Sequence, residues 1–139
     1  MISASSIKDT LKPKSRGIKK EQRLRKKADF QRAYSSGRSH SNYLLVLRSI
    51  ANSLGITRFG FVVSKRLGNA VKRNRLRRQL KEIVRVLDIK ENVDLVFIAR
   101  VPAKEASFQQ LQQAVRDLLN RTKLIIEDTR LVGNEREQG

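Results

Sequence analysis

Cationic side chains crowd one short stretch of the chain, from Lys72 to Arg85. Seven of its fourteen positions are basic, namely Lys72, Arg73, Arg75, Arg77, Arg78, Lys81 and Arg85. Arginine predominates, and its planar guanidinium suits two-point contacts with phosphates and guanine edges. In a helix, Arg73, Arg77 and Lys81 follow one another at i, i+4 spacing and repel one another. A self-repelling segment of this kind predicts a polyanionic partner, usually nucleic acid.

The charge of the whole chain supports the same interpretation. It has 31 Lys and Arg against 13 Asp and Glu, a net charge of +18. The excess lies in residues 1–81, which hold 22 basic and 3 acidic residues, whereas residues 82–139 hold 9 and 10. A surface that serves only solubility normally mixes both signs. We therefore favour nucleic acid over a solubility surface, and also over an anionic membrane surface.

Groups that could catalyse a reaction or bind a metal are few. The chain has no cysteine, which excludes disulfides and thiolate sites and fits a cytoplasmic location. The single histidine, His40, is predicted to be a surface residue in a loop rich in Ser, Gly and Arg. The carboxylates are scattered, no GxxxxGK[ST] motif occurs, and no apolar run approaches the ~20 residues that span a bilayer. We expect no catalytic residue, metal or cofactor on the protein, no membrane partner and no small-molecule substrate.

The periodicity of apolar residues predicts one domain of residues 23–123 between a basic disordered tail, 1–22, and a polar tail, 124–139. Helices are predicted at 27–36, 70–87 and 107–119, and strands at 42–50, 57–64 and 93–99. Asn52-Ser53-Leu54-Gly55 is typical of a hairpin turn between the first two strands. The predicted fold is an α+β sandwich of order α-β-β-α-β-α, with helices packed on a small mixed sheet.

Two details concern how the basic segment is held. An apolar stripe predicts that helix 70–87 packs on the sheet through Leu76, Leu80, Ile83, Val84 and Leu87 and presents cations on its other side. Asn69 is well placed to cap this helix. On the preceding strand, Gly60 leaves its face open to the close approach of another group.

Residues 59–78, Phe-Gly-Phe-Val-Val-Ser-Lys-Arg-Leu-Gly-Asn-Ala-Val-Lys-Arg-Asn-Arg-Leu-Arg-Arg, resemble the signature of the protein subunit of bacterial ribonuclease P. Arg23–Lys26, leading into Asp29-Phe30-Gln31 and Tyr34, is similar to an N-terminal block of that family. Asp94–Arg100 is similar to the family's strand after the basic helix. The resemblance extends from about Arg23 to Leu119.

The resemblance implies a subunit of an RNA-based endoribonuclease that matures tRNA 5′ ends, in which the RNA, with bound Mg²⁺, performs the hydrolysis. It implies a left-handed β-α-β crossover, where general rules favour a right-handed one. It assigns binding of the catalytic RNA to Lys65, Arg66, Asn69, Lys72, Arg73, Asn74, Arg75, Arg77, Arg78 and Lys81. It assigns the 5′ leader of precursor tRNA to a cleft between the first helix and the sheet, with Phe30, Tyr34, Arg48 and Ser64.

The residues by themselves leave alternatives open. Phe30 and Tyr34 could be ordinary core aromatics at i, i+4 spacing. A structural RNA-binding protein, such as a ribosomal protein or an RNA chaperone, would explain the charge equally well. A DNA-binding regulator is less favoured, because the basic helix lacks a following heptad zipper and a helix-turn-helix partner.

Overall fold

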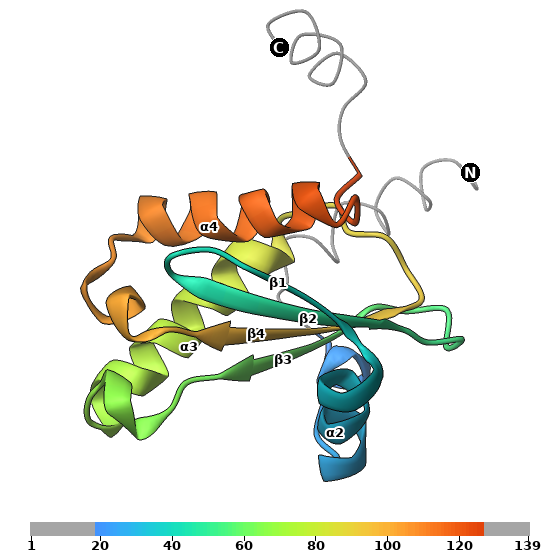
Figure 1. Cartoon of the computed structure of the whole chain (residues 1–139), viewed down its shortest axis with the longest axis horizontal. Helices are drawn as coiled ribbons and strands as arrows, with labels where there is room; N and C mark the ends of the chain where they lie inside the picture. The colour runs from blue at the N-terminus through green and yellow to red at the C-terminus, as the bar shows by residue number, and fades with distance from the viewer. Residues whose placement is uncertain (1–18, 127–139) are drawn as a thin grey trace, which may run out of the picture.

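The computed structural model describes residues 19–126, which form helices on both sides of a four-stranded sheet (Figure 1). The elements, in chain order, are η1 (Lys20–Gln22), α2 (Lys27–Ser36), β1 (Arg38–Ser41), β2 (Leu45–Ala51), β3 (Arg58–Val62), η2 (Lys65–Leu67), α3 (Ala70–Arg85), β4 (Val93–Ala99), η3 (Val101–Glu105) and α4 (Phe108–Arg121). The three predicted helices and three predicted strands are confirmed, with shifts at their ends. Of the two predicted tails, only residues 19–22, which include η1, and residues 124–126 are described, and the remainder lies outside the described residues.

The strand order, β1-β2-β4-β3, corrects the predicted hairpin at Asn52–Gly55. β4 lies between β2 and β3, antiparallel to β2 and parallel to β3. The local turn forms as expected, since Gly55 has a φ of 79° and Asn52 Oδ1 accepts a hydrogen bond from the Leu54 amide. The residues of the turn reverse the chain here, but they do not determine which strand pairs with β2. The pairing follows from burial, because β4 is almost entirely apolar and its central position in the sheet buries both of its faces. β3, α3 and β4 form the β-α-β unit to which the expected crossover applies.

The edge strand β1 was not predicted, because Arg-Ser-His-Ser has no apolar alternation. It pairs with β2 in antiparallel register, from Arg38 opposite Ser49 to Ser41 opposite Val46. An edge strand is held by backbone hydrogen bonds whatever its side chains. The prediction that His40 is a surface loop residue is therefore wrong. His40 is a half-buried residue of β1, and its buried Nδ1 has no hydrogen-bond partner among residues 19–126.

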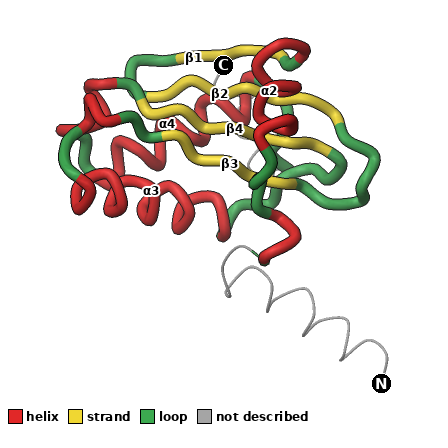
Figure 2. The backbone as a smooth tube through the Cα atoms, turned by 90° about the horizontal axis from the view of Figure 1, so that it is seen from below, coloured by secondary structure: helices red, strands yellow, loops and turns green. Residues whose placement is uncertain are grey.

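The two faces of the sheet carry different helices (Figures 1 and 2). On one face, α3 and α4 enclose the larger core around Leu47, Phe97 and Leu118, which are fully buried. On the other face, α2 packs over a smaller cluster around Leu24 and Val96. Alternation along each strand produces this division, since successive side chains point to opposite faces. α2 therefore has a sheet surface to itself, away from the basic helix α3.

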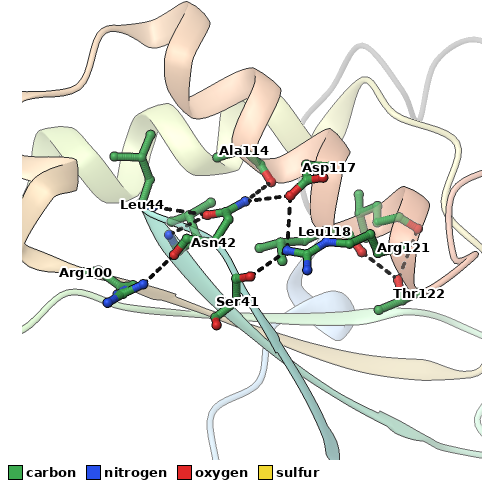
Figure 3. Close-up of polar contacts among 11 residues, drawn as sticks. Ser41, Asn42, Leu44, Arg100, Ala114, Asp117, Leu118, Arg121 and Thr122 are labelled. Atoms are coloured by element: carbon green, nitrogen blue, oxygen red, sulfur yellow. Dashed lines mark hydrogen bonds and ion pairs between the residues drawn. The ribbon is translucent and has the colours of Figure 1, made fainter.

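The β1–β2 turn is fastened to α4 through Asn42 (Figure 3). Asn42 Oδ1 accepts hydrogen bonds from the Leu44 and Leu45 amides, at 3.1 and 2.9 Å. Its Nδ2 donates to the Ala114 carbonyl and to Asp117 Oδ2, both at 3.1 Å. One side chain thus closes the turn and docks the β1–β2 edge of the sheet against the helix above it.

Candidate nucleic-acid interface

The basic helix α3 begins at a well-defined cap. Asn69 Oδ1 accepts a hydrogen bond from the Lys72 amide at 3.0 Å, as an N-cap side chain does. Gly68 has a φ of 125°, a conformation that glycine adopts readily. The predicted stripe is confirmed for Leu76, Leu80, Ile83 and Val84, which are buried against the sheet and α4, whereas Leu87 lies beyond the end of α3 and is only partly buried. Packing on this stripe holds α3 in place and leaves its basic side chains outside the core.

Some cations of α3 are held by the chain itself. Arg73 Nε donates to the Gly68 carbonyl at 3.1 Å, and Arg77 Nη1 donates to Asn74 Oδ1 at 2.6 Å. Arg85 forms an ion pair with Glu82 at 2.9 Å. Arg73, Asn74 and Arg77 of the predicted RNA-binding set therefore also have structural contacts, as does the capping residue Asn69.

Other cations have no such partner. Within residues 19–126, no hydrogen bond or ion pair holds the side chains of Lys65, Arg66, Lys72, Arg75, Arg78 and Lys81. All except the half-buried Lys81 are exposed to solvent. Unpaired cations at this density do not stabilise the helix, because they repel one another. This arrangement forms a surface that phosphate groups can neutralise.

The basic side chains of α3, both paired and unpaired, point in several directions around the helix. Successive residues of a helix turn by about 100°, so Lys72 and Arg75 lie on one flank and Arg73 and Arg77 near the other. Arg78 points outward between the two flanks. The interface is therefore a broad basic ridge, and the Arg73-Asn74-Arg75 segment reaches both sides of it.

Three of the four residues predicted to bind the leader lie together at α2. The Phe30 ring is half-buried over Gly60, and a Cβ built on Gly60 would lie 2.6 Å from Phe30 Cε1. The open face predicted at Gly60 is thus filled by an aromatic ring of the same chain. The Tyr34 ring centroid lies 6.5 Å from that of Phe30, and Tyr34 is 41% exposed. Arg48 donates to the backbone carbonyls of Ala33 and Tyr34 at the end of α2.

Ser64 lies apart, beyond the end of β3, where it precedes η2. No hydrogen bond of the described residues links it to Phe30, Tyr34 or Arg48. A half-buried apolar row, Val46, Ile98 and Val62, crosses the same face of the sheet. Ile98 and Val62, like Phe30, pack against the small buried cluster beneath α2. The two predicted sites therefore occupy different parts of the molecule, the α3 ridge and the α2 face.

A buried carboxylate under α2 was not singled out from the sequence. Asp94 of β4 is fully buried and receives hydrogen bonds from Arg58 Nε at 2.9 Å and Arg58 Nη2 at 2.7 Å. Asn52 Nδ2 donates to it at 2.7 Å, and Arg32 of α2 donates at 3.4 Å. Arg58 also pairs with Asp29 of α2 at 3.3 Å. The signal was present, since Asp94 is the one charged residue in the apolar strand Val93–Ala99.

This cluster has a defined electrostatic character. Burial on its own would raise the pKa of Asp94, but the hydrogen bonds from Arg58 and Asn52, with the charges of Arg58 and Arg32, lower that pKa below its ordinary value. The hydrogen bond to Asp94 likewise raises the pKa of Arg58. Asp94 is thus a charged anchor that ties α2 to the sheet and sets the position of Phe30 and Tyr34.

Residues 19–126 contain no group of three or more His, Cys, Asp or Glu side chains that could hold a metal ion. In the same part of the chain, no helix is long and apolar enough to cross a membrane.

Comparison with known proteins identifies the family. A model of the ribonuclease P family matches residues 18–123. The ribonuclease P protein component of Alkaliphilus metalliredigens is 41% identical over 105 residues, which cover 74% of this chain and 95% of the relative. That of Roseiflexus castenholzii is 44% identical over 111 residues, covering 78% of this chain and 91% of the relative.

Solved structures agree with this assignment. The ribonuclease P protein of Staphylococcus aureus matches with a TM-score of 0.69 and 37% identity, covering 76% of this chain and 98% of that protein. The protein from Thermotoga maritima matches with a TM-score of 0.67 and 30% identity, covering 76% and 98%. The chain therefore belongs to the ribonuclease P protein family and serves the ribonuclease P holoenzyme in tRNA 5′ processing, where the catalytic centre lies in the RNA.

Proposed function

We propose that this chain binds the catalytic RNA through the α3 ridge and η2, and holds the 5′ leader of precursor tRNA at the α2 face. The observation that carries the proposal is a set of six cations whose side chains have no partner within the described residues: Lys65, Arg66, Lys72, Arg75, Arg78 and Lys81. Folding leaves these charges uncompensated, and the phosphates of a structured RNA would neutralise them and release counterions. Mg²⁺ belongs to the RNA in this proposal, and no residue of this chain is assigned to it.

The α2 face has the chemistry that a single strand requires. Aromatic rings hold bases by stacking, worth about 1–3 kcal/mol per base, and nearby cations hold the backbone. Tyr34 offers an exposed ring beside the half-buried Phe30, next to the apolar row of Val46, Ile98 and Val62. Arg48 is engaged with the end of α2, so we assign it to positioning that helix under the leader. Ser64 could contact the strand only where it leaves this face toward η2.

The proposed function is tested by reconstituted cleavage. Adding the chain to a ribonuclease P RNA is expected to lower the magnesium concentration needed to cleave precursor tRNA, because the protein supplies part of the positive charge. The measurement is the cleavage rate over a magnesium titration, with and without protein. No stimulation at any magnesium concentration would refute the proposal.

Leader binding is tested at Tyr34, whose exposed ring can be removed with little disturbance of the core. Tyr34→Ala is expected to weaken binding of precursor tRNA to the holoenzyme by about tenfold, the loss of roughly one stacked base. Binding of mature tRNA, which has no leader, should not change. Tyr43→Ala is the matched control, since Tyr43 is 74% exposed in the β1–β2 turn beside α4. Equal losses for precursor and mature tRNA would exclude the leader assignment.

A further inference from the structure

A small hollow lies between α3 and the η3 turn, and its lining is unusual for a protein surface. It has a volume of about 220 Å³. Its lining includes three basic side chains, Lys72, Arg75 and Lys104, and three buried apolar residues, Leu67, Leu76 and Ala103. Glu105 is the one acidic residue of this lining. We call this hollow the Lys104 pocket.

The charges of the Lys104 pocket are not balanced by the protein. Lys72, Arg75 and Lys104 are exposed, and none of them forms a hydrogen bond or ion pair through its side chain within residues 19–126. Against the single Glu105 they leave a net charge of +2. The three cations repel one another, and an anion bound among them would attract all three and offset that repulsion.

The positions of these side chains are set by the backbone. Lys72 and Arg75 lie three residues apart on one flank of α3, away from Arg73, which is bound to the Gly68 carbonyl. The stem of Lys72 packs over Gly68, where a Cβ would lie 3.1 Å from Lys72 Cδ. α3 therefore presents both Lys72 and Arg75 to the hollow.

The η3 turn that carries Lys104 is fixed in the same way. Pro102 stands near the start of η3, and Ala103 donates a backbone hydrogen bond to the Arg100 carbonyl at 2.8 Å. The Ala103 side chain is buried in the main core beneath the turn. Lys104, the next residue, is thereby held at the rim of the hollow.

We propose that the Lys104 pocket binds one phosphodiester group of the catalytic RNA, shared by Lys72, Arg75 and Lys104. This inference rests on the proposed function of α3 and adds Lys104 of η3 to the interface. Ligand pockets for drug-sized molecules usually occupy about 300–1,000 Å³, so this hollow suits a phosphate group rather than a whole nucleotide. Guanidinium and ammonium groups are the usual partners of phosphate oxygens. Arg75 then works with Lys104 across the hollow, and Arg73 makes a separate contact.

The first test is the affinity of the chain for a ribonuclease P RNA, measured over a series of salt concentrations. Lys104→Ala is expected to weaken binding by about tenfold at low salt, as the loss of one charged hydrogen bond does. The plot of log K against log salt should become less steep by about one. Lys90→Ala is the matched control, because Lys90 is exposed and lies beyond the far end of α3. Equal effects of Lys104→Ala and Lys90→Ala on RNA binding would refute phosphate binding in the Lys104 pocket.

A double-mutant cycle then asks whether the cations share one phosphate. Combining Lys104→Ala with Arg75→Ala should cost less than the product of the two single losses, because the first substitution already releases the shared group. Combining Lys104→Ala with Arg73→Ala should give the full product. If the two double variants deviate equally from the product of their single losses, Lys104 and Arg75 do not share one phosphate. Circular dichroism and thermal unfolding of each variant verify that the fold is kept.

Replacing Glu105 should change RNA affinity in the direction opposite to that of the lysine and arginine variants. Glu105→Gln removes the acidic group of the pocket and is expected to strengthen binding by about twofold at low salt, in the range of exposed charge interactions. Unchanged or weaker binding would count against a phosphate in this hollow. Failure of the wild-type chain to bind the RNA would overturn the proposed function together with the pocket. Binding by the wild type, with no difference between Lys104→Ala and Lys90→Ala, would overturn the pocket alone.

Discussion

Asp94→Ala is expected to lower the free energy of unfolding by about 3–5 kcal/mol, the usual cost of removing one partner of a buried ion pair. The carboxylate is fully buried and receives hydrogen bonds from Arg58, Asn52 and Arg32. Without it, the Arg58 side chain, which is 17% exposed, keeps only the Asp29 partner at 3.3 Å. Urea unfolding followed by circular dichroism measures the change.

Two variants show whether this loss has the proposed cause. Glu82→Ala removes an acidic residue from an exposed pair with Arg85 and should cost no more than about 1 kcal/mol. Combining Asp94→Leu with Arg58→Met leaves no unpaired charge in the centre of the cluster, so it should recover part of the stability lost by Asp94→Leu alone. A cost for Asp94→Ala as small as that for Glu82→Ala would contradict the role of Asp94 as an anchor.

The lowered pKa of Asp94 gives the same prediction a pH dependence. At pH values between its folded pKa and the ordinary value of 3.8, the Asp94 carboxylate binds a proton more readily in the unfolded chain than in the folded one. The stability from Asp94 is therefore fully present above about pH 4 and is lost as the pH falls through the folded pKa. Asp94→Asn should remove this part of the acid dependence, which unfolding curves between neutral and acid pH would show.

Replacing Arg73 and Arg75 together by alanine is expected to weaken assembly with the catalytic RNA by about 100-fold or more at low salt. The two side chains lie on different flanks of α3 and would contact different phosphates, each worth about 1.5–3 kcal/mol as a charged hydrogen bond. A filter-binding titration with ribonuclease P RNA measures the loss. Precursor cleavage at high RNA and protein concentrations should be largely restored, because the substitutions affect assembly and leave the RNA catalyst intact.

Lys90→Ala combined with Arg116→Ala is the charge-matched control, since both side chains are exposed and lie outside α3. A similar loss in this control would show that only net charge matters. Because Arg73 also donates to the Gly68 carbonyl, thermal unfolding of the Arg73 variant must be measured alongside. Arg75→Lys separates charge from geometry, since lysine keeps the charge but cannot form the planar two-point contact.

Much of the α3 site could be predicted from local patterns. The apolar stripe of Leu76, Leu80, Ile83 and Val84 predicted both the helix and its buried side, and Asn69 predicted its cap. These features depend on residues within a few positions of one another, so the sequence displays them directly. The same holds for α2, where the spacing of Phe30 and Tyr34 placed both aromatics on one side of a helix.

The strand pairing, in contrast, depends on residues that are distant in the sequence. Asn52–Gly55 has the composition of a hairpin turn and does turn, yet β4, from more than thirty residues further along the chain, pairs with both β2 and β3. Likewise Arg38–Ser41 carries no strand pattern and becomes a strand because the exposed edge of β2 offers it backbone partners. Residues distant in sequence settle these pairings, and no local window contains them.

By itself, the sequence determined the basic charge of the first 81 residues, the amphipathic helix that presents it and a motif that resembles one family. Tertiary structure alone decided which charges are free. It paired Arg58 with Asp94, bound Arg73 to Gly68, and brought Lys104 of η3 beside Lys72 and Arg75. The reason is physical, because the energy of a charge depends on its burial and nearest partners, and folding sets both across long stretches of chain.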